Sequence, residues 1–136
     1  MLFFHLRWWI LSKGLEKLSL HPIYKKLIDD RHEVIQFKTL DGKFSRYFKI
    51  SQGQIQSEVG DHRYATLIVQ INDSKYINRL MHQGKNLQPL IKGLQFGEIS
   101  TRGDISLLFW FFELIYTKPI QSWLKPFNWA RTLHFS

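Results

Sequence analysis

Apolar residues are spaced like helices at the start of the chain and like strands in its middle. Over residues 2–30 they recur three and four positions apart, which predicts helix. Pro22 suits a first helical turn, so we expect two helices that separate at His21 and Pro22. Between residues 33 and 71 apolar and polar positions alternate, which predicts strands.

Tight-turn sequences divide this alternating region into strands with short connections. The clearest is Asp41–Gly42, a dipeptide typical of β-hairpins. The strands expected here are 33–40, 44–50, 54–59 and 65–71. Because their connections are short, we expect an antiparallel meander.

The remaining elements alternate between helix and strand. A helix beginning near Asp73 is expected to end at Gly84, and a short helix over 87–92 to end at Gly93. The last elements are a strand over 96–101, a helix over 105–116 and a tail with a short helical stretch around Trp123.

Together these elements predict one α+β domain over residues 1–136. It has N-terminal helices over 1–30, a core over 31–116 and a basic, aromatic tail over 117–136. We expect a sheet of about five strands, mostly antiparallel, with the helices packed on one face.

The segment 105–116 is more apolar than one buried helix face requires, because only Ser106 and Glu113 are polar. The positions expected to face the sheet are Ile105, Leu108, Phe112 and Ile115; those expected to face elsewhere are Leu107, Trp110, Phe111 and Leu114. Leaving one large apolar side chain in water forgoes about 1.5–3 kcal/mol. The second face therefore needs a cover, from the chain's own ends, another subunit, a membrane or an apolar ligand.

The strand-to-helix segment 96–104 resembles a signature of sterol-carrier-protein-2-like (SCP2-like) domains. That signature is a strand of the form G-k-i-x-i-x-G-D before a helix, and Gly97, Gly103 and Asp104 match it closely. The order of elements over 30–116 is also similar. The resemblance implies a five-stranded sheet, helices on one side, and a hydrophobic cavity for sterols, acyl chains, phospholipids or isoprenoid quinones.

Some bacterial relatives in this family look like accessory factors of ubiquinone biosynthesis. The resemblance therefore implies non-catalytic binding or transfer of a lipid or isoprenoid, with protein partners in a biosynthetic complex. We expect the cavity between the sheet and the helix over 105–116, and its lining follows from the faces of the expected elements. The expected lipid-binding residues are Leu80, Ile91, Leu94, Phe96, Leu108, Phe109, Phe112 and Ile115.

Charge and tryptophan favour a membrane surface as a further partner. The net charge is +8, and the excess lies at the two ends, which also hold four of the five tryptophans. Trp prefers the membrane interface, and Lys and Arg attract anionic headgroups. The residues expected to dock are Trp8, Trp9, Trp123, Lys13, Lys17, Lys118 and Lys125. A solvated basic face, a nucleic-acid-binding module and a protein scaffold are the alternatives.

Several classes of chemistry lack their sequence signals. The chain has no cysteine, which excludes disulfides and thiolate sites and suits a cytoplasmic location. Its six histidines form no HxH or HxxxH pair, and neither a GxSxG elbow nor a glycine-rich phosphate loop is present. We therefore expect no metal, no cofactor and no enzymatic activity. Gly97, Gly103 and Asp104 are expected to act structurally. Glu113 is expected to be exposed, and the alternative is a hydrogen bond to a ligand headgroup within the cavity.

Overall fold

A computed structural model describes residues 2–73, 76, 87–115 and 120. Its elements, in chain order, are α1 (Leu2–Leu18), α2 (Pro22–Ile28), β1 (Glu33–Thr39), β2 (Ser45–Ser51), β3 (Gln54–Val59), β4 (Leu67–Ile71), α4 (Gln88–Gln95), β5 (Ile99–Gly103) and α5 (Ser106–Ile115). The helix expected from Asp73 to Gly84 lies almost entirely outside the described residues, as does the expected C-terminal tail.

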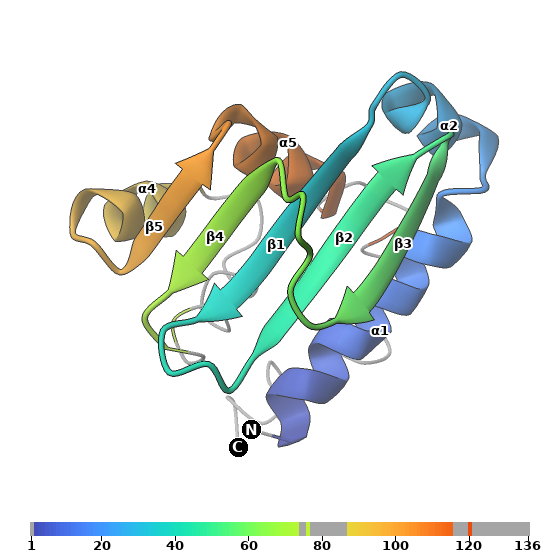
Figure 1. Cartoon of the computed structure of the whole chain (residues 1–136). Helices are drawn as coiled ribbons and strands as arrows, with labels where there is room; N and C mark the ends of the chain where they lie inside the picture. The colour runs from blue at the N-terminus through green and yellow to red at the C-terminus, as the bar shows by residue number, and fades with distance from the viewer. Residues whose placement is uncertain (1, 74–75, 77–86, 116–119, 121–136) are drawn as a thin grey trace, which may run out of the picture.

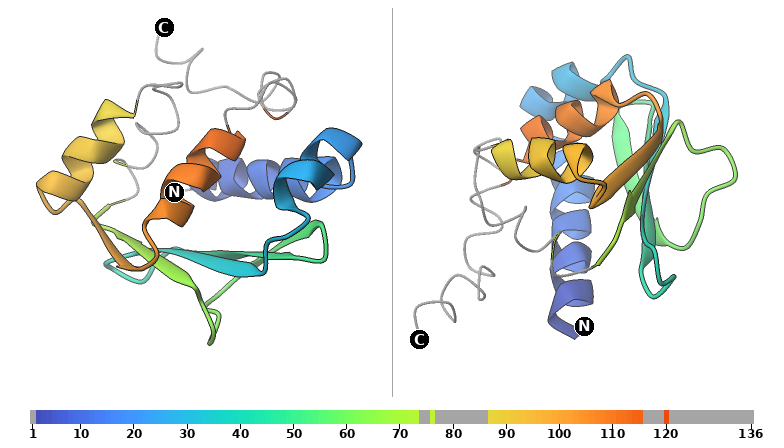
Figure 2. Two further views of the ribbon diagram at one scale, coloured as in Figure 1. Left: turned by 90° about the horizontal axis from the view of Figure 1, so that it is seen from above. Right: turned by 90° about the vertical axis from the view of Figure 1, so that its left-hand side faces the viewer.

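The five strands form one mixed sheet in the order β3-β2-β1-β4-β5. Adjacent strands are antiparallel except β1 and β4, which are parallel. Helices α1, α2, α4 and α5 all lie on one side of this sheet (Figures 1 and 2). The predicted fold class is confirmed, but the expected meander holds only for β1 to β3. The chain then crosses to the far side of β1, because the hairpin of β2 and β3 occupies the near side.

Strand alternation separates an apolar face from a polar one. Phe37, Phe48 and Val69 are buried on the helix side, whereas Lys38, Lys49 and Gln70, one residue further along, point to the other side and are partly or fully exposed. Burying the apolar set stabilises the stack of sheet and helices, since each fully buried large side chain contributes about 1.5–3 kcal/mol.

Polar side chains of α1 and of the turn that follows it bind the free edge of β3. The carboxylate of Glu16 accepts a hydrogen bond from the backbone N–H of Ser57 at 2.8 Å, and the hydroxyl of Ser19 accepts one from Ile55 N–H at 3.3 Å. An unpaired strand edge is a template for association with another chain. These two bonds occupy part of that edge and fix α1 along it.

A glycine and a cap place α5 after β5. Gly103 has φ +113°, and a Cβ atom there would lie 2.2 Å from the carbonyl oxygen of Thr66. Asp104 then accepts hydrogen bonds from the hydroxyl and the N–H of Ser106, at 2.7 and 3.0 Å, and these bonds lower the pKa of Asp104. The strand therefore turns into the helix within two residues.

Arg31 joins the start of β1 to α5. Its guanidinium lies 4.2 Å from the ring centroid of Trp110 and 3.8 Å from the carboxylate of Glu33. Burial raises the pKa of Glu33; Arg31 opposes this shift and the charge of Asp104 adds to it. Ionisation of Glu33 therefore lowers the stability of the folded state slightly.

Gly103→Ala should destabilise the protein strongly, because the new methyl group meets a backbone carbonyl at an unfavourable φ. The control is Gly42→Ala, which has φ +75° but no atom within 4 Å of the added Cβ. We expect the control to lose about 1 kcal/mol of unfolding free energy and Gly103→Ala about 2 kcal/mol more. Urea denaturation measures both, and equal losses would show that the close approach to Thr66 is unimportant.

Glu33→Gln should remove part of the pH dependence of stability. The folded-state pKa of Glu33 lies above its ordinary value of 4.5. The folded protein therefore binds the proton more tightly than the unfolded chain, and stability is lost as the pH rises through the interval just above 4.5. Glutamine does not ionise, so the variant does not lose this stability. Its unfolding free energy should therefore rise relative to that of wild type between about pH 4 and pH 7.

The measurement is urea denaturation of both proteins at the two pH values. Glu98→Gln is the control, because it removes the same charge at an exposed position. A stability difference between Glu33→Gln and wild type that stays constant with pH would contradict the assignment.

Candidate functional site

An aromatic cluster fills the space between the sheet and the helices. The ring of Trp8 on α1 lies 5.1 Å from that of Phe37 and 5.0 Å from that of Phe44. Phe111 on α5 lies 5.2 Å from Phe37 and 4.9 Å from Phe48. Such tilted contacts add about 0.5–1.5 kcal/mol per pair beyond the burial of area. The cluster joins α1, β1, β2 and α5 into one apolar layer.

Helix α5 buries two adjacent rows of side chains rather than one. The rows are Leu107, Phe111 and Leu114, and Leu108, Phe112 and Ile115. Our sequence-based assignment of faces was partly wrong, because Phe111 packs on the sheet and Ile105 is 41% exposed. Ile105 precedes the first helical residue, so it does not continue either row. Glu113 is exposed, as expected.

One residue of the expected C-terminal tail reaches the buried core. Ile120 is fully buried in the same core cluster, and its N–H donates a hydrogen bond to the hydroxyl of Tyr24 on α2 at 3.2 Å. Trp110 remains half-buried beneath Arg31. The tail therefore contributes at least this residue to the core in which α5 is buried.

Half-buried apolar side chains follow the core along α4 and α5. Leu87, Leu94, Phe109 and Trp110 all pack against the buried cluster while keeping contact with solvent. Leu90 is buried among them, although it was not one of the expected lipid-binding residues. Its signal was its position between Leu87 and Leu94, at three- and four-residue spacing. The apolar core thus extends to the molecular surface along these two helices.

The expected lipid-binding residues fall into three groups. Leu108, Phe112 and Ile115 are buried in the core, and Ile91, Leu94 and Phe109 are half-buried on α4 and α5. Phe96 is 77% exposed at the end of α4, so it does not line an interior with the others. Leu80 lies outside the described residues.

The expected membrane-docking residues divide in a similar way. Trp9 is 49% exposed on α1, beside the exposed Lys13 and Lys17. The prediction that Trp8 docks on a membrane is wrong, because Trp8 is 2% exposed and belongs to the aromatic cluster. Adjacent helical residues are about 100° apart, so only one of two consecutive tryptophans faces outward. Trp123, Lys118 and Lys125 lie outside the described residues.

A buried arginine forms the polar part of the layer. Arg46 is 7% exposed, and its guanidinium donates hydrogen bonds to the hydroxyls of Ser12 at 3.2 Å and Ser57 at 3.1 Å. Burial lowers the pKa of Arg46, and the charge of Glu16 opposes that shift. The alternation of residues along β2 indicates that Arg46 shares the inner face with Phe48. Nothing in the sequence indicates that Ser12 is its partner. The group holds α1 against β2 and β3.

The remaining motif residues have structural roles. Gly97 adopts φ +80° in the turn before β5, and Gly103 and Asp104 form the junction with α5 described above. In the ranges that the structure describes, no three His, Asp or Glu side chains gather as a group that could hold a metal ion. Over the same residues, no helix is both long and apolar enough to cross a bilayer.

Comparison with known proteins finds similarity in solved structures alone. No protein-family model matches the sequence, and no curated protein matches it. A structure described as "UbiJ-SCP2 Ubiquinone synthesis protein" is 19% identical with a TM-score of 0.58, covering 77% of this chain and 88% of that one. Sterol carrier protein 2 from Yarrowia lipolytica, in its apo form, is 14% identical with a TM-score of 0.57, covering 82% and 84%.

The same fold also occurs inside a larger enzyme. The sec-alkylsulfatase Pisa1 from Pseudomonas sp. is 18% identical with a TM-score of 0.54, and the match covers 70% of this chain but 15% of the enzyme. Fold likeness at this identity carries no activity with it. The matches to the ubiquinone synthesis protein and to sterol carrier protein 2 each cover more than three quarters of this chain and of the other. The chain therefore has the fold of sterol carrier protein 2 domains.

Proposed function

We propose that this protein binds the hydrocarbon chain of a lipid in its apolar layer, next to α5, and that it does so without catalysing a reaction. The observation that carries the proposal is the row of half-buried apolar side chains along α4 and α5. These side chains connect the core to solvent, which is where an acyl, sterol or polyprenyl chain would enter. Removing apolar surface from water supplies the driving force.

The ligand class follows from the lining. Leu94 and Phe109 offer aliphatic and aromatic surface, and neither α4 nor α5 places a carboxylate among the buried residues of this layer. Such a surface selects length and bulk rather than a polar headgroup. A polyprenyl intermediate of ubiquinone synthesis is the specific ligand we favour, because a structure with this fold is described as a ubiquinone synthesis protein. In that role the protein would present its ligand to modifying enzymes as an accessory factor.

Helix α1 is proposed to bring the domain to a membrane surface. Its exposed stripe combines the ring of Trp9 with Lys13, whose ammonium lies 5.9 Å from the ring centroid, and with Lys17 one turn further on. An interfacial tryptophan beside lysines fits an anionic membrane, where each basic residue contributes about 1 kcal/mol. The ligand would then pass between the bilayer and the apolar layer without crossing much water.

Native mass spectrometry of the purified protein, followed by organic extraction, tests lipid binding. We expect a bound apolar molecule, and we expect Phe109→Asp to retain far less of it, because the new carboxylate would have to lose its hydration in the layer. Phe96→Asp is the matched control, since Phe96 lies at the surface. Circular dichroism checks that both variants fold.

Three outcomes would contradict the proposal. One is a folded wild-type protein that carries no lipid and takes up none from vesicles. Another is equal retention by Phe109→Asp and the control. A third is binding of nucleic acid that falls steeply with salt and is unaffected by lipid, which would support the nucleic-acid-binding alternative instead.

Vesicle flotation tests the membrane surface. Trp9→Ala and Lys13→Glu should each reduce binding to vesicles that contain phosphatidylglycerol, and binding should weaken as salt is added. Tyr64→Ala is the control, because Tyr64 is 74% exposed in the loop between β3 and β4, which lies on the side of the sheet away from α1 (Figure 2). Equal binding by wild type and the α1 variants would exclude α1 as the docking element.

A further inference from the structure

The sheet face opposite the helices carries a hollow of about 300 Å³ over β1, β4 and β5. Its lining residues are Lys38, Ile68, Gln70, Ser100, Thr101 and Arg102. Among the residues that the structure describes, no helix covers this face (Figure 2). The apolar layer proposed to bind lipid lies on the other side of the sheet, so this hollow is a separate place on the molecule.

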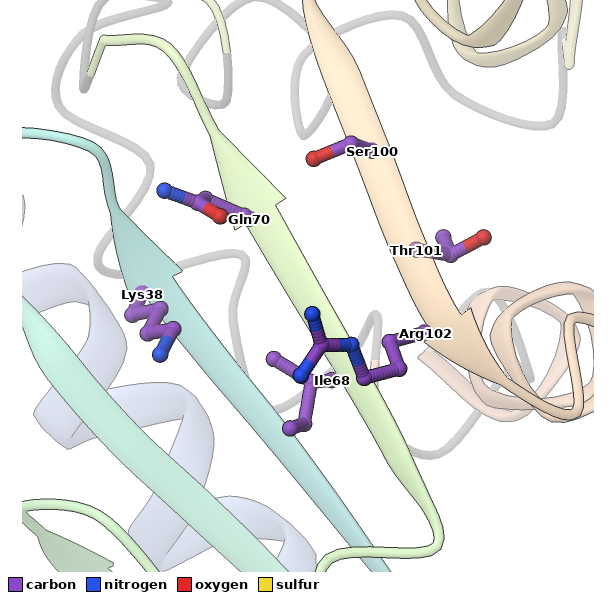
Figure 3. Close-up of a pocket in the computed structure, with 6 residues that line it drawn as sticks. All are labelled: Lys38, Ile68, Gln70, Ser100, Thr101 and Arg102. Carbon is purple, nitrogen blue, oxygen red and sulfur yellow. The ribbon is translucent and has the colours of Figure 1, made fainter.

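Strand register brings the polar side chains of the hollow together. Lys38 pairs with Gln70, and Gln70 pairs with Ser100, so these three residues form one row across three strands. Arg102 pairs with Ile68 in the next row. Figure 3 shows Ser100 pointing toward Gln70 and the Arg102 side chain reaching over Ile68, while Thr101 points the opposite way.

The two cations of the hollow have no anionic partner in the described part of the chain. The ion pairs found there are Lys13 with Glu16 and Arg31 with Glu33, and neither Lys38 nor Arg102 takes part. The carboxylate of Glu58, on β3, accepts a hydrogen bond from the Tyr47 hydroxyl at 2.8 Å. Lys38 on β1 and Arg102 on β5 lie on either side of β4, so an anion placed over β4 would attract both charges.

Asp61 defines the limit of the site toward β2. It lines a neighbouring hollow of about 430 Å³, which shares Lys38 and Gln70 with the first. Its carboxylate accepts a hydrogen bond from the hydroxyl of Ser45 rather than pairing with Lys38. Its negative charge therefore lowers the positive potential at one end of the site without filling it.

We propose that the hollow between Lys38 and Arg102 binds a phosphate group. The guanidinium of Arg102 offers parallel N–H donors to two phosphate oxygens, and the ammonium of Lys38 supplies a second positive charge. The hydroxyl of Ser100 and the amide NH₂ of Gln70 donate to the remaining oxygens. Ile68 forms an apolar floor, and the lining contains no carboxylate to repel the ligand.

The phosphate can belong to a water-soluble molecule or to a lipid headgroup, and the experiment separates the two sources. Isothermal titration with inorganic pyrophosphate at low salt measures the first. Flotation with vesicles of phosphatidylcholine, with and without phosphatidic acid, measures the second. We expect saturable binding of pyrophosphate, or binding to phosphatidic acid vesicles that the phosphatidylcholine vesicles do not show.

Single variants locate the site. Lys38→Gln and Arg102→Gln should each weaken the binding about tenfold, because each removes one charge-assisted contact. Lys49→Gln is the matched control, since Lys49 is an exposed lysine on the same face but outside the hollow, and it should change affinity by less than about twofold. Asp61→Asn should strengthen the binding by removing a nearby negative charge.

Two results would overturn the proposal: no saturable binding in either arm, or equal weakening by Lys49→Gln and the two site variants, which would indicate general attraction to a basic surface. All these residues lie at the surface, so thermal unfolding should show that the variants fold. Lipid retention on the helix side should stay unchanged in Lys38→Gln and Arg102→Gln. Failure of this site therefore differs from failure of the lipid proposal.

Discussion

The contact of Phe111 with Phe37 and Phe48 is the interaction on which the rest of the structure depends. It fixes the rotation of α5 about its own axis, because a helix that places Phe111 on the sheet must also bury Leu107, Leu108 and Phe112. Trp8 meets the same phenylalanines from α1, so both helices are positioned by one cluster. Both proposals rest on it: the layer beside α5 exists because the helix lies there, and the far face of the sheet is left polar because the near face takes the apolar side chains.

The sequence predicted the elements and their class because strand alternation and glycine turns are local signals. The inward set of β2, the turn at Asp41–Gly42 and the junction of Gly103 with Asp104 all depend on neighbouring residues, and each is present in the structure. Strand order is not local. The parallel pairing of β1 with β4 depends on which edge of β1 remains free once β1 has paired with β2. No residue of β4 indicates this pairing in the sequence.

Site prediction failed where the amino-acid type allowed two environments. Trp8 and Trp9 are identical in type and adjacent, yet one lies in the core and the other at the surface, and the choice depends on the phase of α1 against the sheet. The prediction of which side of α5 faces the sheet was partly wrong for the same reason. A helix that is apolar on almost every side does not indicate which side packs inward. Phe96 is a different case, because the helix α4 ends at the preceding residue and leaves its side chain in solvent.

The sheet keeps its two chemistries apart, and this separation constrains what one ligand can do. The two proposed ligands, a hydrocarbon chain beside α5 and a phosphate beside Arg102, would lie on opposite faces of the strands β4 and β5, with buried Leu67 and Val69 between them. A single lipid can reach both only around the edge at β5, since the strand ladder leaves no passage through its hydrogen bonds. Two separate ligands, each bound through its own chemistry, need no such path. If both proposals hold, the geometry thus favours independent binding, of hydrocarbon on the apolar face and of phosphate on the basic face.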